Sequence, residues 1–468
     1  MTLVGTDTNP LRVAIIGSGP AAFYAADELL KQKDLVIEID MFDRLPTPFG
    51  LVRGGVAPDH QKIKSVTKAY DGIASHPRFR FYGNVEYGQH IKLIDLKDHY
   101  HQILFATGAQ TDRRMGISGE DLDGSHPATE FVAWYNGHPD YRHLKFDLSH
   151  ERVAVVGVGN VAIDVARILC LTPAELAETD MADYAIDALS HSQVKEVHLL
   201  GRRGPAQAAF TNPEIKEVGE LEDADAITLS DEVQLDELSV TELASLNDRT
   251  LNKKVEIIQS YAHAARRSVS KARKLYIRFL VSPTEMIDDG HGQVCGLKLV
   301  HNVLYKTEAG TLSPKATDQF EQLHVGLVFR SVGYRGVPLP EVPFNDRYGV
   351  IMNDKGRVIE VESKQQVIGE YAAGWIKRGP SGVIGTNKPD SVETVTHMLE
   401  DLRSGSILQP VQPTVNSMAD LIKQRQPQFF SYLDWKKLDE LEVAKGQPLG
   451  RPRVKFTSVA EMITALGK

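Results

Sequence analysis

Cysteine is nearly absent, because the 468-residue sequence contains only Cys170 and Cys295. These two lie far apart in the chain, so they form no Cys-x-x-Cys redox pair and cannot supply a four-cysteine zinc site. An iron–sulfur cluster held by four thiolates is excluded for the same reason. We expect both cysteines to be buried apolar residues, one ending a helix and one in the strand-like stretch 294–300. The composition fits a reducing compartment, and we expect the cytoplasm.

Long apolar runs are also missing. No stretch of about 18 apolar residues occurs, so no membrane span is expected. Residues 1–10 lack a secretory apolar core and an arginine-rich transit pattern, and we expect a short soluble leader there. Basic residues are not in excess: 53 Lys and Arg against 62 Asp and Glu give a net charge of −9, which argues against a nucleic-acid binder. The length and the 42% hydrophobic content predict a globular protein of two or three domains.

Glycine, in contrast, is well represented, and near the N-terminus it lies between an apolar strand pattern and a helical pattern. The apolar run 13–16 ends at glycines, a helical pattern follows over residues 21–30, and a second apolar strand over residues 36–42 ends at Asp43. This strand–turn–helix–strand order is the setting in which a dinucleotide-binding fingerprint occurs. We therefore predict a dinucleotide-binding unit here.

The turn itself has the residues that such a unit needs. Gly17 permits a tight turn, Gly19 lets the backbone approach a pyrophosphate, and Ala22 keeps the helix close to the strand. The helix N-terminus then presents N–H groups to the phosphates.

The same pattern recurs at residues 152–162. Gly157, Gly159 and Ala162 repeat the spacing, and residues 163–169 continue as a helix. A nicotinamide-only dehydrogenase needs one such unit. Two units indicate a flavin nucleotide and a nicotinamide nucleotide held in one protein.

The residue that follows the second strand distinguishes the two units. In the first unit it is Asp43, which can accept hydrogen bonds from a ribose hydroxyl, with Asp40 as a rival inside the strand. In the second unit the strand at residues 196–200 leads to Arg202 and Arg203. Guanidinium groups suit a 2′-phosphate, so the pattern favours NADP over NAD, with a solvated basic turn as the alternative.

The predicted fold class is α/β, with two Rossmann-like nucleotide-binding domains. Strand-like segments at 103–109 and 371–375 close the first unit, although the second unit lies between them in sequence. We therefore expect the NADP domain (111–331) to be inserted into a discontinuous FAD domain (1–110 and 332–468). Beyond residue 408 we predict connectors with short helices, at 418–423 and 459–466, and no chemistry.

Two charge runs stand out in the middle of the chain. Residues 217–237 contain nine acids and no Lys or Arg, and we expect them to form a solvated face. Residues 261–278 contain six bases and no acid. This basic segment either forms another solvated face or attracts an acidic partner.

Four segments carry a resemblance to a known family: 46–60 (PTPFGLVRGGVAPDH), 157–164 (GVGNVAID), 201–204 (GRRG) and 374–386 (GWIKRGPSGVIGT). The chain resembles, in order and over roughly residues 10–460, the adrenodoxin reductase family, the ferredoxin–NADP reductases of mitochondria and bacteria. The resemblance implies FAD and NADPH as cofactors, with hydride passing from the nicotinamide to the flavin N5. It also implies single-electron transfer to an iron–sulfur ferredoxin, and a monomer.

Cofactor contacts carry over by position. For FAD they are Gly17, Gly19, Ala21, Asp43, Leu51, Val85, Trp375, Gly382, Val383 and Ile384. For NADP they are Arg113, Val158, Gly159, Asn160, Val161, Arg202, Arg203, Glu214 and Gly382. Asp43 stands where a longer Glu is common, and Val158 replaces a frequent Gln, so a side-chain contact is lost there while backbone donors remain.

Three polar residues are candidates for a catalytic role. His60 and Asp164 are suited to proton handling near the flavin, with a structural hydrogen bond as the alternative for each. Glu214 could orient the nicotinamide amide, and the alternative is an ordinary acid at a helix start. Hydride transfer needs no side-chain nucleophile, so no obligate base is assigned.

The sequence thus predicts an FAD-dependent NADPH:ferredoxin oxidoreductase, with the ferredoxin docking near Arg266, Arg267 and Lys271. A disulfide reductase is disfavoured because the chain has no redox dithiol. A flavin monooxygenase and a nucleotide-binding redox sensor remain as alternatives.

Overall fold

The computed structural model describes residues 3–264 and 271–468, which fold into two compact units. Unit 1 comprises Met1–Thr111, Asn136–Asp140 and Tyr334–Lys468, and unit 2 comprises Asp112–Tyr135 and Tyr141–Gly333. Residues 136–140 thus belong to unit 1, although we expected them in the inserted domain. The reason is local: Asp140 forms an ion pair with Arg44 at 2.5 Å, and Asn136 accepts a hydrogen bond from Lys455 at 3.3 Å.

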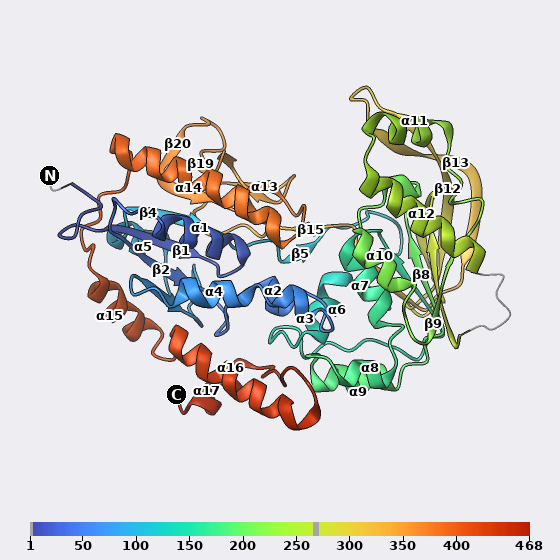
Figure 1. The fold of residues 1–468 in the computed structure, drawn as a ribbon, viewed down its shortest axis with the longest axis horizontal. Helices are drawn as coiled ribbons and strands as arrows, with labels where there is room; N and C mark the ends of the chain where they lie inside the picture. The colour runs from blue at the N-terminus through green and yellow to red at the C-terminus, as the bar shows by residue number, and fades with distance from the viewer. Residues whose placement is uncertain (1–2, 265–270) are drawn as a thin grey trace. The chain divides into compact units, whose positions relative to one another are not determined.

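Unit 1 is built on a seven-stranded sheet with the order β18-β19-β20-β4-β1-β2-β3 (Figure 1). The five strands from β20 to β3 run parallel, and the chain order reverses at β1, which pairs with β2 on one side and β4 on the other. β1 is buried along its whole length, which explains its nearly unbroken apolar sequence. The strands are β1 (Leu11–Ile16), β2 (Ile37–Phe42), β3 (Phe79–Tyr82), β4 (Gln102–Phe105), β18 (Asn353–Asp354), β19 (Arg357–Ile359) and β20 (Gln366–Ala372).

Helices cover both faces of this sheet. On one face α1 and α14 lie side by side and share a core with α4, α16 and α17 (Figure 1). On the other face α5 and α15 complete a second core. The helices are α1 (Pro20–Leu30), α2 (Leu51–Gly54), α3 (Gln61–Lys64), α4 (Thr67–Ala74), α5 (Leu93–His99), α13 (Trp375–Arg378), α14 (Asn387–Ser404), α15 (Val415–Arg425), α16 (Tyr432–Gly446) and α17 (Val459–Leu466).

The C-terminal tail is more structured than we expected. α15 and α17 confirm the two predicted helices, but the longest helix of the tail, α16, was not predicted. α16 begins at a capping box in which Ser431 and Asp434 bond to each other's backbone N–H groups. Its Trp435 and Leu438 are buried against the core of unit 1, so the tail is an integral layer of that unit.

Unit 2 is built on a six-stranded parallel sheet with the order β6-β14-β7-β8-β10-β9. Helices α6, α7, α9, α10 and α12 cover one face, and the antiparallel sheet β11-β12-β13 covers the other. The strands are β6 (Ser125–Pro127), β7 (Arg152–Val156), β8 (Glu196–Leu200), β9 (Ala224–Thr228), β10 (Arg273–Arg278), β11 (Val281–Asp288), β12 (Val294–Lys306), β13 (Leu312–Leu323) and β14 (Leu327–Arg330). The helices are α6 (Ala128–Tyr135), α7 (Asn160–Ile168), α8 (Pro173–Ala177), α9 (Asp183–Ser190), α10 (Asn212–Val218), α11 (Glu237–Leu246) and α12 (Arg249–Ala264).

The two charge runs of the sequence meet in this sheet. Because β10 pairs with β9, Arg273 lies 3.1 Å from Asp223, and Arg278 lies 2.6 Å from the buried Glu232. The acidic run is therefore not simply a solvated face, since part of it neutralises the basic segment. Lys271 donates to the carbonyl of Leu221, and residues 266 and 267 lie outside the described residues.

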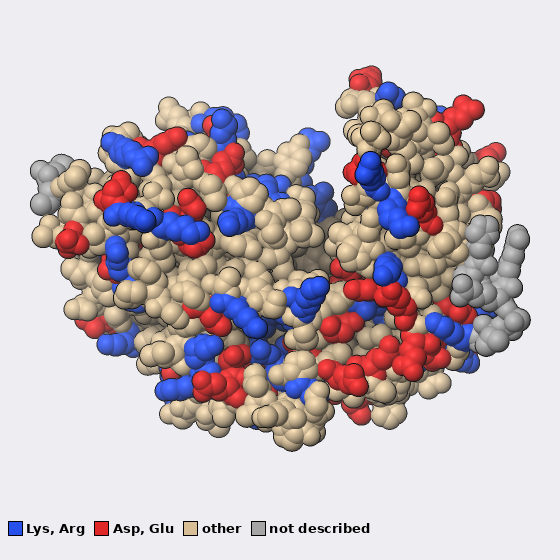
Figure 2. Space-filling view, viewed as in Figure 1, with Lys and Arg blue, Asp and Glu red and all other residues tan. Residues whose placement is uncertain are grey.

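Acidic side chains are unevenly distributed over the surface of the protein. Figure 2 shows acidic side chains concentrated where α8 to α10 lie, whereas both signs of charge are interspersed over unit 1. Within the parts of the chain that the structure describes, no helix is long and apolar enough to cross a lipid bilayer.

Candidate functional site

The glycine turn of unit 1 lies between β1 and α1, at the carboxyl edge of the parallel sheet. Gly17 has φ +102°, and a Cβ there would lie 2.5 Å from the carbonyl oxygen of Ala106, so only glycine fits. The space around Gly19 is open, in contrast to that around Gly17, because no atom lies within 4 Å of a Cβ built on Gly19. α1 then starts with Pro20, which leaves its first N–H groups facing this open space. The turn is shaped to hold a phosphate group.

Asp43 follows β2 at the same edge. Its Oδ2 accepts hydrogen bonds from the N–H and the hydroxyl of Ser18, at 3.0 and 2.5 Å, and its Oδ1 accepts one from Leu45 N–H at 2.9 Å. A carboxylate has about four acceptor sites, so capacity for one further donor remains. Burial raises the pKa of Asp43, although these hydrogen bonds oppose the shift. Ser18 was not among the predicted site residues; its place between Gly17 and Gly19 was the available signal.

The rival Asp40 has a structural role. It is fully buried, and its carboxylate pairs with Arg12 at 2.6 Å and with Arg80 at 2.5 Å, while the hydroxyl of Tyr100 donates to it at 2.6 Å. Because these donors occupy the carboxylate inside the core, Asp40 is not available to a ligand. The geometry therefore favours Asp43 as the ribose partner.

Three further predicted contacts lie around the turn. Val85 is buried, and its N–H donates to the carbonyl of Asp43 at 2.8 Å. Ala21 is packed under Gly374, where a Cβ would come within 2.6 Å of the Ala21 methyl group. Leu51, in contrast, is exposed at the start of α2. Val85, Ala21 and Leu51 thus come from three different segments of unit 1.

A second loop at this edge joins β20 to α14. Trp375 follows Gly374, and its indole N–H donates to the carbonyl of Ser381 at 3.2 Å. Gly382 has φ +79°, and a Cβ there would lie 2.3 Å from the Thr386 hydroxyl. The N–H groups of Gly382 and Val383 have no acceptor among the described residues, and both residues are exposed. Gly382 and Val383 lie directly before a short 3₁₀ helix that begins at Ile384.

Unit 2 repeats the glycine turn between β7 and α7. Gly157 has φ +130°, and a Cβ there would lie 2.2 Å from the carbonyl oxygen of Ser331. Gly159 again has no atom within 4 Å of a Cβ. Asn160 starts α7, and its side chain accepts a hydrogen bond from Thr211 N–H at 2.9 Å. That side chain is thus committed to the fold, which leaves the backbone of residues 158–161 for a ligand.

The end of β8 carries two cations where unit 1 has a carboxylate. Arg202 is exposed, and Arg203 is half-buried with a 3.4 Å hydrogen bond to the carbonyl of Gln207. Desolvation and repulsion from Arg202 lower the pKa of Arg203 below its ordinary value. In the described part of the chain neither guanidinium forms an ion pair with a carboxylate. An anion placed between them would relieve this repulsion.

Arg113 lies beside the link to unit 1. It is exposed, and its backbone N–H donates to the carbonyl of Gly333 at 2.9 Å. This hydrogen bond holds the backbone of Arg113 beside the segment that follows β14.

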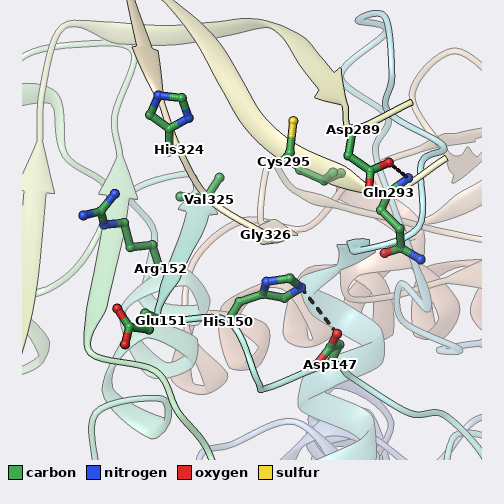
Figure 3. Close-up of a pocket in the computed structure, with 11 residues that line it drawn as sticks. Asp147, His150, Glu151, Arg152, Asp289, Gln293, Cys295, His324, Val325 and Gly326 are labelled. Carbon is green, nitrogen blue, oxygen red and sulfur yellow. Dashed lines mark hydrogen bonds and ion pairs between the residues drawn. The ribbon is translucent and has the colours of Figure 1, made fainter. Parts of the chain in front are cut away.

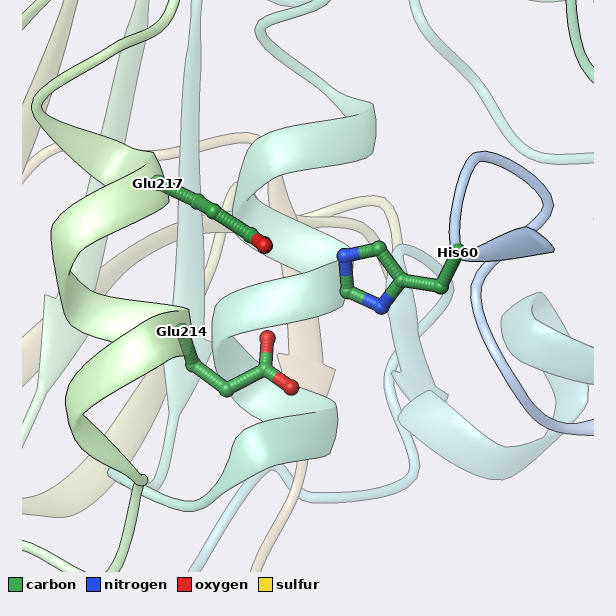
Figure 4. Close-up of side chains that lie close together, drawn as sticks. All are labelled: His60, Glu214 and Glu217. Atoms are coloured by element: carbon green, nitrogen blue, oxygen red, sulfur yellow. The ribbon is translucent and has the colours of Figure 1, made fainter. Parts of the chain in front are cut away.

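The predicted catalytic residues come from both units. Glu214 and Glu217 extend from one face of α10, with Glu214 buried in the first turn (Figure 4). Asp164 lies 3.4 Å from Arg167 on α7, and Arg167 lies 3.8 Å from Glu217. This network supports the structural alternative for Asp164. In unit 1, His60 precedes α3 and donates its backbone N–H to the carbonyl of Ala57 at 3.0 Å.

A separate cavity of about 520 Å³ opens in unit 2 (Figure 3). It is lined by Asp147, His150, Glu151, Arg152, Asp289, Gln293, Val294, Cys295, His324, Val325 and Gly326. Glu151 is already paired with Lys195, and Arg152 with Glu196. No predicted contact residue lines this cavity, so we place the functional site at the two glycine turns.

The cysteines show no redox pair. Both are free thiols. Cys170 is buried, as expected, and burial raises its pKa to about 12. Cys295 is partly exposed at the cavity, so the expectation that it is buried was wrong. It is the second residue of β12 and lies next to the 289–293 turn, which also lines the cavity.

Comparison with known proteins agrees with this geometry. Residues 11–220 match the model of the family described as pyridine nucleotide-disulphide oxidoreductase. The chain is 45% identical over 460 residues to a probable ferredoxin/ferredoxin–NADP reductase of Mycobacterium bovis, covering 97% of this chain and 76% of that protein. It is 39% identical to the mitochondrial NADPH:adrenodoxin oxidoreductase of Arabidopsis thaliana, covering 98% of this chain and 96% of that protein.

A solved structure gives the same result. The fold superimposes on Mycobacterium tuberculosis FprA in complex with NADPH with a TM-score of 0.91 and 42% identity, covering 98% of this chain and 100% of that one. Sequence and fold agree over nearly the whole length. The chain therefore belongs to the adrenodoxin reductase-type family of ferredoxin–NADP reductases.

Proposed function

We propose that this protein is an FAD-dependent NADPH:ferredoxin oxidoreductase, with FAD bound by unit 1 and NADP(H) by unit 2. One observation carries the proposal. The two units have equivalent glycine turns, but the second strand of each unit is followed by residues of opposite charge: Asp43 after β2, and Arg202 and Arg203 after β8. A carboxylate accepts from a ribose hydroxyl, whereas paired guanidinium groups bind a 2′-phosphate. The family relatives carry names that refer to NADPH, ferredoxin and adrenodoxin.

The residues of unit 1 fit FAD. The open space at Gly19 and the start of α1 would hold the pyrophosphate, and Asp43 retains an acceptor site for the ribose. The N–H groups of Gly382 and Val383 can donate to the flavin ring, which gains negative charge on reduction. Leu51, Val85, Ala21, Trp375 and Ile384 supply the apolar surroundings of this site.

The residues of unit 2 fit NADP(H) in the same way. Gly159 and the backbone N–H groups of residues 158–161 would hold the pyrophosphate, Arg202 and Arg203 would hold the 2′-phosphate, and Arg113 would add a further cation. When bound, the two nucleotides supply hydride transfer from nicotinamide to flavin and release of single electrons to an iron–sulfur acceptor. The protein contributes binding, orientation and electrostatics.

Polar side chains complete the proposed mechanism. The carboxylate of Glu214 would accept a hydrogen bond from the nicotinamide amide and so help to orient it. His60 would hold the proton that accompanies flavin reduction. For Asp164 we propose the structural role, because it pairs with Arg167 at 3.4 Å on the same helix.

For the protein partner we propose an iron–sulfur ferredoxin that docks near Arg266, Arg267 and Lys271. The segment from residue 261 to 278 contains no acid, which suits an acidic partner. Because the ammonium of Lys271 donates to Leu221, we assign the larger effect to the two arginines. Arg266→Ala/Arg267→Ala should slow ferredoxin reduction and flatten its salt dependence without changing NADPH oxidation by a small-molecule acceptor; unchanged ferredoxin kinetics would remove this docking site.

The decisive experiment mixes the purified protein anaerobically with NADPH and, separately, with NADH while flavin absorbance is followed. We expect fast bleaching by NADPH, slow bleaching by NADH, and selective loss of the NADPH reaction in Arg202→Ala/Arg203→Ala. Arg152→Ala is the matched control, because Arg152 is an exposed arginine of unit 2 that pairs with Glu196. A protein without flavin, or one that both nucleotides reduce equally well, contradicts the proposal.

A further inference from the structure

Helix α16 of the C-terminal tail is connected to the glycine turn of unit 1 by a continuous series of contacts. At its centre is Glu442, whose side chain is 0% exposed. The carboxylate accepts two parallel hydrogen bonds from Arg53 of α2, at 2.5 and 2.8 Å, and a third from Phe456 N–H at 2.9 Å. Arg453 contributes a fourth contact at 3.4 Å. One buried carboxylate thus joins α2, α16 and the segment before α17.

Arg53 is held from a second direction as well. Its guanidinium lies 5.0 Å from the ring centroid of Trp435, which is also on α16, and its backbone carbonyl accepts from Lys455 at 3.4 Å. α2 has only four residues and no side-chain cap, so it cannot hold its own conformation. The contacts with α16 and with the 453–456 segment therefore determine where α2 lies.

From α2 the contacts continue to the phosphate-binding turn. Trp435 meets Phe49 edge to face, with ring centroids 5.7 Å apart. Phe49 has φ +84°, a conformation that a non-glycine residue keeps only when its surroundings enforce it, and its N–H donates to the carbonyl of Ser18 at 2.9 Å. The adjacent Gly50 approaches Gly19 so closely that a Cβ there would lie 3.0 Å from the Gly19 Cα.

We propose that Glu442 is a positioning residue for the flavin nucleotide: through its ion pair with Arg53 it holds the 49–54 segment against the glycine turn and so sets the affinity for FAD. This inference rests on the proposed function of unit 1, and it assigns a role to the C-terminal tail. Glu442 touches no ligand itself. Removing its charge leaves the Arg53 guanidinium, whose side chain is only 12% exposed, without this carboxylate partner, so we expect α2 to move and bring that group to water.

The test is FAD binding to the apoprotein, followed by quenching of flavin fluorescence. Glu442→Gln should weaken FAD binding at least tenfold and accelerate FAD release, while NADP⁺ binding to unit 2 stays unchanged. At saturating FAD, the visible circular dichroism of the bound flavin should differ from that of the wild type. Arg53→Lys, which keeps the charge and loses the two-pronged contact, should give an intermediate loss.

Asp401→Asn is the matched control. Asp401 is also a buried carboxylate of unit 1, paired with Arg357 at 2.8 Å and bonded to the Tyr371 hydroxyl at 2.8 Å, but it lies at the far end of α14. This variant should lower the thermal stability of the apoprotein while FAD affinity and the flavin spectrum stay unchanged. If both variants weaken FAD equally, Glu442 is merely structural and the inference fails.

Two further outcomes separate the inference from the proposed function. If the wild-type apoprotein does not bind FAD, the proposed function fails. If the wild type binds FAD and Glu442→Gln binds it equally well, only the positioning role fails. If the glutamine variant does not fold, Glu442→Asp takes its place, because it keeps the charge on a shorter side chain. Wild-type FAD affinity and a wild-type flavin spectrum in Glu442→Asp would equally overturn the positioning role of Glu442.

Discussion

The two glycine turns of this protein have the same backbone design but opposite charge at the end of the next strand. Gly17 and Gly157 each have a positive φ and lie against a carbonyl oxygen of a neighbouring strand end. A Cβ would lie 2.5 Å from that oxygen at Gly17 and 2.2 Å from it at Gly157. After the second strand, unit 1 has Asp43, whereas unit 2 has two arginines.

This difference separates two properties of a dinucleotide-binding unit: phosphate binding and the choice of nucleotide. The glycines determine whether a dinucleotide phosphate can approach the backbone at all. The charge at the strand end determines which nucleotide is accepted, because the ribose bears a hydroxyl in one case and a phosphate in the other. The comparison therefore predicts that substitutions in the two units affect the two nucleotides independently.

The largest effect should come from the glycines themselves. Gly157→Ala places a methyl group against Ser331 and strains the backbone, so NADP(H) affinity should fall by about 100-fold or more while flavin content stays unchanged. Gly17→Ala should abolish flavin binding and spare NADP⁺ binding. Isothermal titration and flavin absorbance measure both. Gly72→Ala, at an open helical position of unit 1, is the control; loss of both nucleotides in either turn variant would contradict independence.

A smaller effect should follow from the strand-end cations. Arg203→Ala removes charge-assisted hydrogen bonds worth about 1.5–3 kcal/mol, so the Kd for NADPH should rise about 10- to 100-fold. The Kd for NADH and that for FAD should not change. Titration of each variant with both nucleotides measures this selectivity. An equal loss of NADH affinity would mean that Arg203 maintains the fold of the turn and does not bind the 2′-phosphate.

Each unit also contains a buried histidine that resists protonation. Burial, assisted by Arg12, lowers the pKa of His101 from 6.5 to about 4, and burial lowers the pKa of His198 in unit 2 to about 4. A depressed folded-state pKa contributes stability that is present above pH 6.5 and is lost as the pH falls through 4, by about 3 kcal/mol per group.

Replacing one of these histidines should therefore act on one unit. His101→Asn keeps an acceptor for Arg12 N–H but does not titrate, so the apoprotein should lose less stability between pH 7 and pH 4 than the wild type. Urea unfolding across this range measures the change. His191→Asn, at a highly exposed histidine, should leave the pH dependence unchanged. An identical pH slope in His101→Asn would show that His101 is not responsible.

The smallest effect should come from Asp43. Because burial raises its pKa, the ionised carboxylate lowers the stability of the apoprotein at pH 7, and stability contributed by the protonated form is lost as the pH rises through the folded-state pKa. Asp43→Asn should therefore keep or raise the unfolding temperature of the apoprotein at pH 7, and this gain should shrink toward pH 4. The Kd for FAD should rise about tenfold with loss of the ribose contact. Reduced stability at pH 7 would mean that the carboxylate is needed for the turn itself.

Local patterns were sufficient wherever short-range geometry decides the structure. The two glycine turns, their strands and helices, and the arginines after β8 can each be recognised from a short segment of the sequence. Hydrophobic periodicity and the steric requirements of glycine are local properties, so they can be derived without knowledge of the fold.

Other features depend on which strands become neighbours. The sequence favoured Asp43 and left Asp40 as a rival, and only the structure shows that Asp40 lies in a core that contains Arg12, Arg80 and Tyr100. The two charge runs were expected to face solvent or a partner, yet the pairing of β9 with β10 places part of one run beside the other.

The sequence by itself thus determined the α/β class, the two nucleotide-binding turns and the opposite charges that follow them. The tertiary structure alone decided which acids remain accessible and that the C-terminal tail reaches the first turn through Glu442 and Arg53. The physical reason is distance along the chain. A buried ion pair between residues 53 and 442 leaves no periodic trace in either segment, because each partner is only a charged residue in its own local context.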